Sequence, residues 1–261
     1  MNGRVASLWR HPVKGFTPER REFATIEAGG FFPSDRIYAV EDGPSGFDPD
    51  APAWVTKQKF AVLAKIADVA RARTTLDDDT GVLRATAEGR PDIAADLTRR
   101  DGRDAFAAWL TALLGEEARG PLRVVQAPGH RFTDHPRGHL SIVNLASVDA
   151  LAEKIGKPLD PLRFRANLYV QGWPAWIEND AVGREVRLGP LTARVFSPIV
   201  RCAATHVDPT TAERDIDIVR ALHEGFGHLH CGIYLSVTQG GTIREGDTAE
   251  LADAPAEGVP A

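Results

Sequence analysis

Short apolar runs, separated by turn residues at close spacing, limit the folds open to this chain more than any other feature. Between residues 5 and 95, polar and apolar positions alternate until Gly, Pro or Asp interrupts them, as at Gly29-Gly30 and in the loop 43–52. This spacing is typical of short strands in a small barrel or a folded sheet. The same pattern returns from residue 163 onward. We therefore expect a mainly β fold with a few helices, of the α+β class.

The apolar runs place the individual strands. A hairpin is predicted at Asp77-Asp78-Asp79-Thr80-Gly81, because this acidic turn separates two short alternating runs. The other expected strands are residues 5–12, 21–27, 37–40, 54–56, 62–71, 122–126, 164–170, 185–188, 191–200, 231–238 and 248–251.

Three segments have helical spacing instead. Asp104–Leu114 is the clearest, because its large apolar residues recur at helical intervals and Gly115 follows as a C-terminal cap. A second helix is expected from Ser147 to Ile155, with Ser147 as its N-cap. A third is expected from Ile216 to His223.

Composition excludes several classes of protein. A chain of 261 residues can bury one large core or two small ones. Its net charge of −5 argues against a nucleic-acid partner, and no apolar run is long enough for a membrane span. The N-terminus lacks a signal-peptide core, and two cysteines make no disulfide framework. We expect a reduced, soluble, cytoplasmic protein.

Cys202 is the strongest candidate for chemistry. The apolar run Leu191–Val200 precedes it, and Asp208-Pro209 ends any continuation, so the cysteine is expected where a strand leaves the core. A free cysteine is more often a small buried hydrophobe. Arg201, its neighbour, would favour the thiolate, which is the form that binds metals.

Two other uses of Cys202 compete with this interpretation. His206 could act as its base in hydrolysis, although residues this close in sequence seldom build such a dyad. A zinc site could combine Cys202 with Cys231 and the pair His228/His230, but their spacing is not that of a zinc finger.

Basic residues at strand ends form a candidate anion site. Lys14 lies in a Pro-x-Lys-Gly turn, Arg36 precedes a strand, and Arg165 precedes Asn167. Each cation alone is typical of a solvated surface, but together they would converge on a phosphate. Asn167, in an apolar run, either caps a turn or hydrogen-bonds a polar ligand.

These motifs, in this order, resemble those of MOSC proteins, the group that includes the amidoxime-reducing component and the C-terminal part of molybdenum cofactor sulfurase. Residues 4–42, with His-Pro-Val-Lys-Gly at 11–15 and Asp35-Arg36, resemble the MOSC N-terminal β-barrel domain. Residues 130–251 resemble the MOSC domain through Phe164–Asn167, Val182–Arg184, the Arg201-Cys202 stretch and Gly240–Asp247. The resemblance implies a MOSC N-terminal β-barrel domain at 1–120, packed on a MOSC β-barrel domain at 121–255.

The resemblance also implies a molybdenum–molybdopterin cofactor. Cys202 would be the catalytic residue and the metal ligand. The other residues that would hold the cofactor are Lys14, Gly15, Arg36, Thr133, Asp134, Arg165, Asn167 and Arg201. The chain departs from the family pattern where Gly15 replaces Ser, Ala166 replaces Pro and Cys231 replaces Phe.

The activity implied is an oxidoreductase that reduces N-hydroxylated compounds such as amidoximes and hydroxylamines. The chain has no cysteine set for an iron–sulfur domain, so electrons would come from a separate flavin, iron–sulfur or haem protein. One alternative is a sulfur-carrier or cofactor-handling protein that uses a Cys202 persulfide. Another is a catalytically silent binding module.

Overall fold

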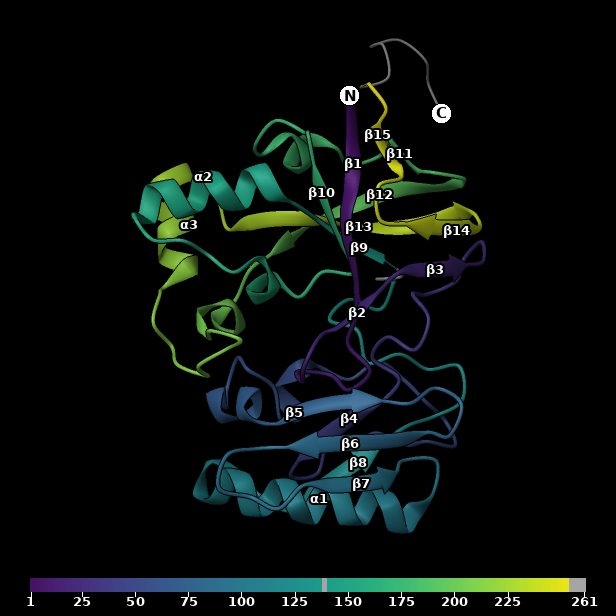
Figure 1. The fold of residues 1–261 in the computed structure, drawn as a ribbon, viewed down its shortest axis with the longest axis vertical. Helices are drawn as coiled ribbons and strands as arrows, with labels where there is room; N and C mark the ends of the chain where they lie inside the picture. Colours follow the sequence, from purple (N-terminus) through teal and green to yellow (C-terminus); the bar gives the residue numbers. More distant parts are fainter. Residues whose placement is uncertain (138–139, 254–261) are drawn as a thin grey trace.

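A closed β-barrel is the largest element of the computed structural model, which describes residues 1–137 and 140–253 (Figure 1). The strand order is β10-β9-β13-β12-β11-β15-β1, and β1 pairs with β10 to close the ring. Only β9 and β10 run parallel among these pairs. The barrel strands are β1 (Asn2–Arg10), β9 (Leu140–Asn144), β10 (Leu168–Gln171), β11 (Glu185–Leu188), β12 (Leu191–Val200), β13 (His230–Gln239) and β15 (Thr248–Leu251).

Apolar side chains at alternate positions of the strands fill the interior of the barrel. In β12, Leu191, Ala193 and Val195 are buried, and they pack with Ile233 and Leu235 of β13. Pro198 lies in the same strand and has no N–H for the ladder, and the pairing of β12 with β13 shifts register beside it. The strand therefore becomes irregular just before the chain reaches the candidate cysteine.

A smaller unit lies below the barrel in Figure 1 and contains two sheets and a helix. The strands β5 (Arg73–Leu76), β6 (Val82–Thr86) and β7 (Ile93–Asp96) form a meander, which confirms the predicted hairpin. A second sheet pairs β4 (Ala39–Asp42) with β8 (Leu122–Val125). The helix α1 (Arg100–Leu114) packs Phe106 and Leu110 into the core of this unit. Gly115, with a φ of 55°, caps the helix as expected.

Two further helices pack on one side of the barrel: α2 (Leu145–Ile155) and α3 (Ile218–Phe226) (Figure 1). Val148 and Leu222 lie in the apolar cluster that they share with the barrel wall. The remaining elements are β2 (Glu19–Arg21), β3 (Phe23–Ile26), β14 (Gly241–Arg244), and the 3-10 turns η1 (Lys57–Lys59), η2 (Ala67–Arg71), η3 (Gly115–Glu117), η4 (Pro161–Phe164), η5 (Ile177–Asp180) and η6 (Ala203–His206).

Three local predictions are wrong. Residues 54–56 and 62–71 contain no strand; residues 67–71 form η2 instead, because a short apolar run alone does not distinguish a strand from a helical turn. The N-cap of α2 is Asn144, whose side chain accepts a hydrogen bond from the Ala146 N–H. Ser147 lies inside the helix, and its hydroxyl donates to the buried Glu178 carboxylate at 2.7 Å.

The predicted class, mainly β with a few helices, is confirmed. Four strand pairs among the described residues cross residue 120: β1 pairs with β10 and β15, β3 pairs with β14, and β4 pairs with β8. The division into 1–120 and 121–255 stays a prediction, and its end at 255 lies outside the described residues. None of the described helices is both long and apolar enough to cross a membrane.

Candidate functional site

A cavity of about 280 Å³ lies between the smaller unit and the barrel. Its lining combines residues of the smaller unit and of the barrel. They include the turn after β1 and the segment after β12. All the predicted site residues line it, and they are Lys14, Gly15, Arg36, Thr133, Asp134, Arg165, Asn167, Arg201 and Cys202. The structure therefore brings the predicted set together at one place, while the role of each residue stays a prediction.

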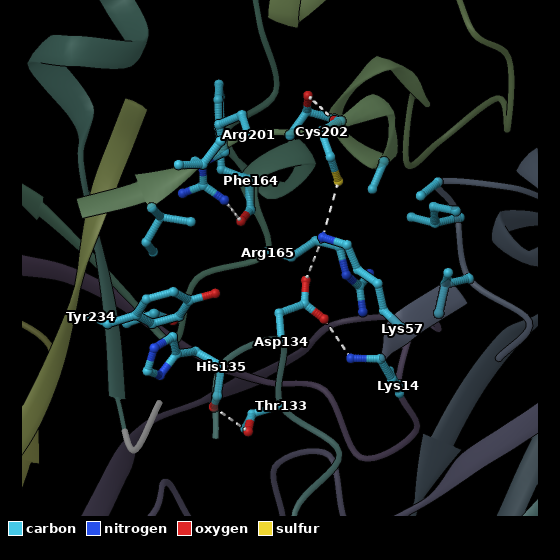
Figure 2. A pocket seen from close by; sticks show the side chains of 18 of the residues that line it. Lys14, Lys57, Thr133, Asp134, His135, Phe164, Arg165, Arg201, Cys202 and Tyr234 are labelled. Atoms are coloured by element: carbon cyan, nitrogen blue, oxygen red, sulfur yellow. Dashed lines mark hydrogen bonds and ion pairs between the residues drawn. The ribbon is translucent and has the colours of Figure 1, made fainter. Parts of the chain in front are cut away.

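Cys202 lies two residues after the end of β12, where it is the N-cap residue of η6. Its backbone carbonyl accepts hydrogen bonds from the Thr205 N–H at 3.0 Å and from the Thr205 hydroxyl at 2.9 Å, which anchors the main chain. The side chain is half-buried, and Sγ lies 3.4 Å from Lys57 Nζ (Figure 2). The sulfur thus faces the cavity rather than the apolar core.

Lys57 is a lining residue that the sequence analysis missed. It belongs to η1, in the polar run Thr56-Lys57-Gln58-Lys59, which carries no signal that separates it from a solvated surface. Its Nζ also lies 3.2 Å from Asp134 Oδ2. Burial lowers the pKa of Lys57, but the Asp134 carboxylate and the contact with Cys202 outweigh burial and raise it. The ammonium that touches the sulfur therefore stays charged.

Lys14 and Asp134 continue this chain of contacts. The Lys14 ammonium donates to the Phe132 carbonyl at 2.8 Å and to Asp134 Oδ1. Burial lowers the pKa of Lys14, and Asp134 opposes that shift. Burial alone would raise the pKa of Asp134, but the charges on Lys14 and Lys57 hold it well below its ordinary value. Asp134 is thus an ionised carboxylate shared by two lysines.

Arg36 and Arg165 both have left-handed backbone, with φ of 50° and 53°. Arg36 donates through Nη1 to Asp35 and through Nη2 to the Arg165 carbonyl at 2.9 Å. Burial and the Arg36 charge lower the pKa of Arg165 to about 10. Arg165 Nη2 is buried and has no hydrogen-bond partner in the described part of the chain. A buried donor of this kind is costly unless an acceptor meets it.

Arg201 and Asn167 serve mainly to brace the wall. The Arg201 guanidinium donates from Nε to the Cys231 carbonyl at 2.7 Å and from Nη1 to the Phe164 carbonyl at 2.8 Å. Asn167 Oδ1 accepts from the Ser141 hydroxyl at 2.9 Å, and its amide donates to the Trp9 carbonyl at 3.3 Å. The cation that contacts the Cys202 sulfur is therefore Lys57 and not its sequence neighbour.

Gly15 explains one departure from the family pattern. Its φ is +90°, and a Cβ added there would lie 3.0 Å from the Ala61 carbonyl oxygen and 3.1 Å from the Val62 Cα. Only glycine adopts such a conformation readily, and it lets the backbone of two segments approach closely. A serine at this position would require the neighbouring segment to shift.

An aromatic wall was also missed. Tyr234 and His135 line the cavity and lie next to each other, with ring centroids 5.9 Å apart (Figure 2). Phe196 stacks behind Tyr234, with centroids 5.9 Å apart and planes at 10°. Burial, followed by the Asp134 charge, raises the pKa of Tyr234 to about 12. The phenol is therefore neutral near pH 7.

The rival uses of Cys202 find no geometric support. His206 Nε2 lies 3.2 Å from Asp217 Oδ1, whereas the described partner of the sulfur is Lys57. Within residues 1–137 and 140–253, no cluster of three His, Cys, Asp or Glu residues could hold a metal. Cys231 is fully buried, and burial raises the pKa of its thiol to about 12.

Comparison with known proteins identifies two domains in this chain. The MOSC domain matches residues 129–250, and the MOSC N-terminal beta barrel domain matches residues 2–117. A molybdenum cofactor sulfurase of Caenorhabditis elegans is 31% identical over 147 residues, which are 54% of this chain and 20% of that protein. Another from Bombyx mori is 34% identical over 121 residues, which are 42% of this chain and 14% of that protein. The matched segment thus spans a fifth or less of these relatives.

Two crystal structures match this chain at low sequence identity. The YUAD protein from Bacillus subtilis is 14% identical, with 96% of each chain covered and a TM-score of 0.47. YiiM from Geobacillus stearothermophilus is 20% identical, with 44% of this chain and 55% of that chain covered and a TM-score of 0.36. On the matched domains, which together cover most of its length, this chain belongs to the MOSC family, with a MOSC N-terminal β-barrel domain followed by a MOSC domain.

Proposed function

We propose that this protein binds a molybdenum–pterin cofactor and reduces N-hydroxylated compounds such as amidoximes and hydroxylamines. One observation carries the proposal: the Cys202 sulfur and the cations Lys14, Arg36 and Arg165 line the same cavity. A thiolate is a soft metal ligand, and Arg and Lys side chains bind phosphate. A cofactor with a sulfur-liganded metal at one end and a phosphate at the other matches this arrangement.

The donor set of the cavity fits such a group. Arg165 Nη2 is a buried donor without an acceptor among the described residues, and a phosphate oxygen would satisfy it. Gly15, which also lines the cavity, lets its turn pack closely against the backbone of Ala61 and Val62, where a Cβ would lie 3.0 Å from the Ala61 oxygen. Among the described residues of the lining, Cys202 is the one cysteine, so the protein would supply a single sulfur ligand.

The chain has three tasks in this reaction. Cys202 would hold the metal, and Lys57, fixed by Asp134, would keep the sulfur oriented toward the cavity. Lys14 and Arg165 would bind the phosphate. The neutral Tyr234 hydroxyl would donate a hydrogen bond to the substrate oxygen, and the stacked Phe196 would keep its ring in place.

When bound, the cofactor supplies two-electron exchange with the N–O bond. The overall change is RNHOH plus two electrons and two protons to RNH₂ plus water. The electrons would come from a separate flavin, iron–sulfur or haem protein, and the protons from solvent.

A second function is favoured by the similarity to proteins named molybdenum cofactor sulfurase. In that case Cys202 would carry a persulfide, or this chain would pass on a finished cofactor. The half-buried sulfur beside Lys57 also suits a persulfide anion. A one-sulfur mass adduct on Cys202, together with transient rather than retained cofactor, would identify this role.

Metal analysis of the protein, produced in a host that makes the cofactor, tests the main proposal. We expect about one molybdenum per chain, lost in Cys202→Ser but kept in the control Cys231→Ala, with turnover only when an electron donor is added. Molybdenum that stays stoichiometric in folded Cys202→Ser would contradict the proposal. So would a wild-type protein that never retains the metal.

A further inference from the structure

A carboxylate is held between two lysines inside the cavity. Asp134 accepts from Lys14 Nζ through Oδ1 and from Lys57 Nζ through Oδ2, the latter at 3.2 Å (Figure 2). The two lysines come from different parts of the chain, the turn after β1 and the turn η1. The exposed fraction of the Lys14 side chain is 4%, against 32% for Lys57 and 42% for Asp134. The Lys14 ammonium, which is almost completely buried, is therefore neutralised by Asp134, the most exposed of the three side chains.

The other cations of the lining are already committed, apart from one. Arg36 is paired with Asp35, and Arg201 donates to backbone carbonyls. Arg163 is paired with two further aspartates. Within the described residues the Arg165 side chain makes no hydrogen bond or ion pair, and its Nη2 is buried. Arg163 also has a buried donor without a partner, Nε, but two aspartates hold its terminal nitrogens.

Asp134 is also the one acidic residue among the described residues that line the cavity. An anion that enters the cavity would therefore meet Arg165 together with Lys14 and Lys57, and Asp134 already shares those two lysines.

We propose that Asp134 is a specificity-determining residue of this pocket, because it competes with anionic ligands for Lys14 and Lys57. Small anions such as inorganic phosphate and sulfate then bind weakly. A ligand that makes contacts beyond its anionic group has the additional binding energy to take over the two lysines. The inference rests on the proposed function, which identifies that ligand. Asp134 is the residue that selects this ligand over small anions.

The competition has an electrostatic signature. Coulomb energy is proportional to the charge of the ligand, so the negative charge of Asp134 opposes a dianion twice as strongly as a monoanion of similar shape. Asp134→Asn keeps the size of the side chain and removes its charge. The gain in affinity for a dianion should therefore approach the square of the gain for the monoanion.

The full chain, produced in a strain that does not make molybdopterin, can be titrated with methyl phosphate and dimethyl phosphate by calorimetry. At pH 8 the first probe carries two charges, since the second phosphate pKa is about 6, and the second probe carries one. We expect Asp134→Asn to bind methyl phosphate about tenfold more tightly and dimethyl phosphate about threefold more tightly than wild type.

Three matched variants serve as controls. Asp134→Glu retains the charge and should bind both probes as wild type does. Asp101→Asn changes the net charge equally but lies outside the cavity, at an exposed ion pair with Arg99, and should change neither affinity. Lys57→Met should weaken binding of both probes, because one ammonium is lost. If Asp134→Asn does not fold, Asp134→Ser replaces it.

Equal gains for the two probes in folded Asp134→Asn would overturn the proposal, because charge would then not be the cause. No gain, or weaker binding of methyl phosphate, would also overturn it and would make Asp134 a support for the lysines. Absence of binding in both wild type and variant would show that the pocket takes no phosphate. Each result is independent of the molybdenum analysis, which is made on protein from a cofactor-producing host.

Discussion

Lys57 Nζ lies 3.4 Å from Cys202 Sγ, although 145 positions separate the two residues. Lys57 belongs to the turn η1 of the smaller unit, and Cys202 lies two residues after the barrel strand β12. The contact therefore joins the two parts of the molecule at the candidate metal ligand. Asp134, which holds the same ammonium at 3.2 Å, extends the junction to the loop before β9.

Lys57→Met should reduce the amount of molybdenum retained by several-fold, because the sulfur loses the ammonium that orients it. Its side chain is 32% exposed, so we expect the free energy of unfolding to fall by about 1 kcal/mol or less. Metal content and urea unfolding measure the two effects. Lys59→Met, at an exposed residue of the same turn that does not line the cavity, is the control. Retention equal to wild type in Lys57→Met would show that the contact has no role in metal binding.

Gly15→Ala should destabilise the protein more than Gly29→Ala. Both glycines have positive φ, +90° and +69°, but only at Gly15 would the added Cβ meet neighbouring backbone, at 3.0 Å from the Ala61 oxygen. Backbone strain is common to both changes and costs about 1 kcal/mol. We expect Gly15→Ala to lose at least about 1 kcal/mol more, measured by urea unfolding. Equal losses would mean that the segment at Ala61 moves freely.

Arg163→Met should loosen the turn that follows Cys202. The Arg163 side chain is 2% exposed and binds Asp208 at 2.6 Å and Asp215 at 2.8 Å. Removal of one partner from a buried ion pair costs about 3 kcal/mol. The matched change Arg220→Met, at an exposed pair with Glu224, should cost about 0.5 kcal/mol or less. A small loss in both variants would show that solvent compensates the two aspartates.

The buried His11 should make the protein sensitive to acid. Burial, with the charges of Arg165 and Arg36, lowers the pKa of this imidazole to about 3. The unfolded chain therefore binds a proton below about pH 6.5 that the folded chain does not take up. The contribution of His11 to the free energy of unfolding is fully present above pH 6.5 and is lost as the pH falls toward 3.

Urea unfolding at pH 7 and pH 5 tests this prediction. Wild type should lose about 2 kcal/mol between these values through His11, and His11→Gln should lose correspondingly less. His223→Gln, at an exposed residue of α3, should keep the wild-type loss. The same acid sensitivity in His11→Gln would assign the effect to other groups, such as His130 and His206, whose pKa values burial also lowers.

Local patterns predicted much of the secondary structure correctly. Leu191–Val200 is a strand with the expected bounds, and so is Thr248–Leu251, because alternation and turn residues act over a few positions. The segment 62–71 was assigned wrongly, since its apolar residues suit a strand and a helical turn equally. Ser147 was assigned as a cap, but its hydroxyl binds Glu178, a partner 31 residues away.

The sequence alone determined the mainly β class, the candidate cysteine and four of the cations that line the cavity, Lys14, Arg36, Arg165 and Arg201, because each of these rests on local pattern or on motifs in order. Only the tertiary structure decided which cation touches the sulfur. Arg201 is the neighbour in sequence, but its guanidinium is held by the carbonyls of Phe164 and Cys231, whereas Lys57 reaches Sγ from another part of the fold. The physical reason is that barrel closure and the packing of the smaller unit set distances between residues far apart along the chain, and no local pattern encodes those distances.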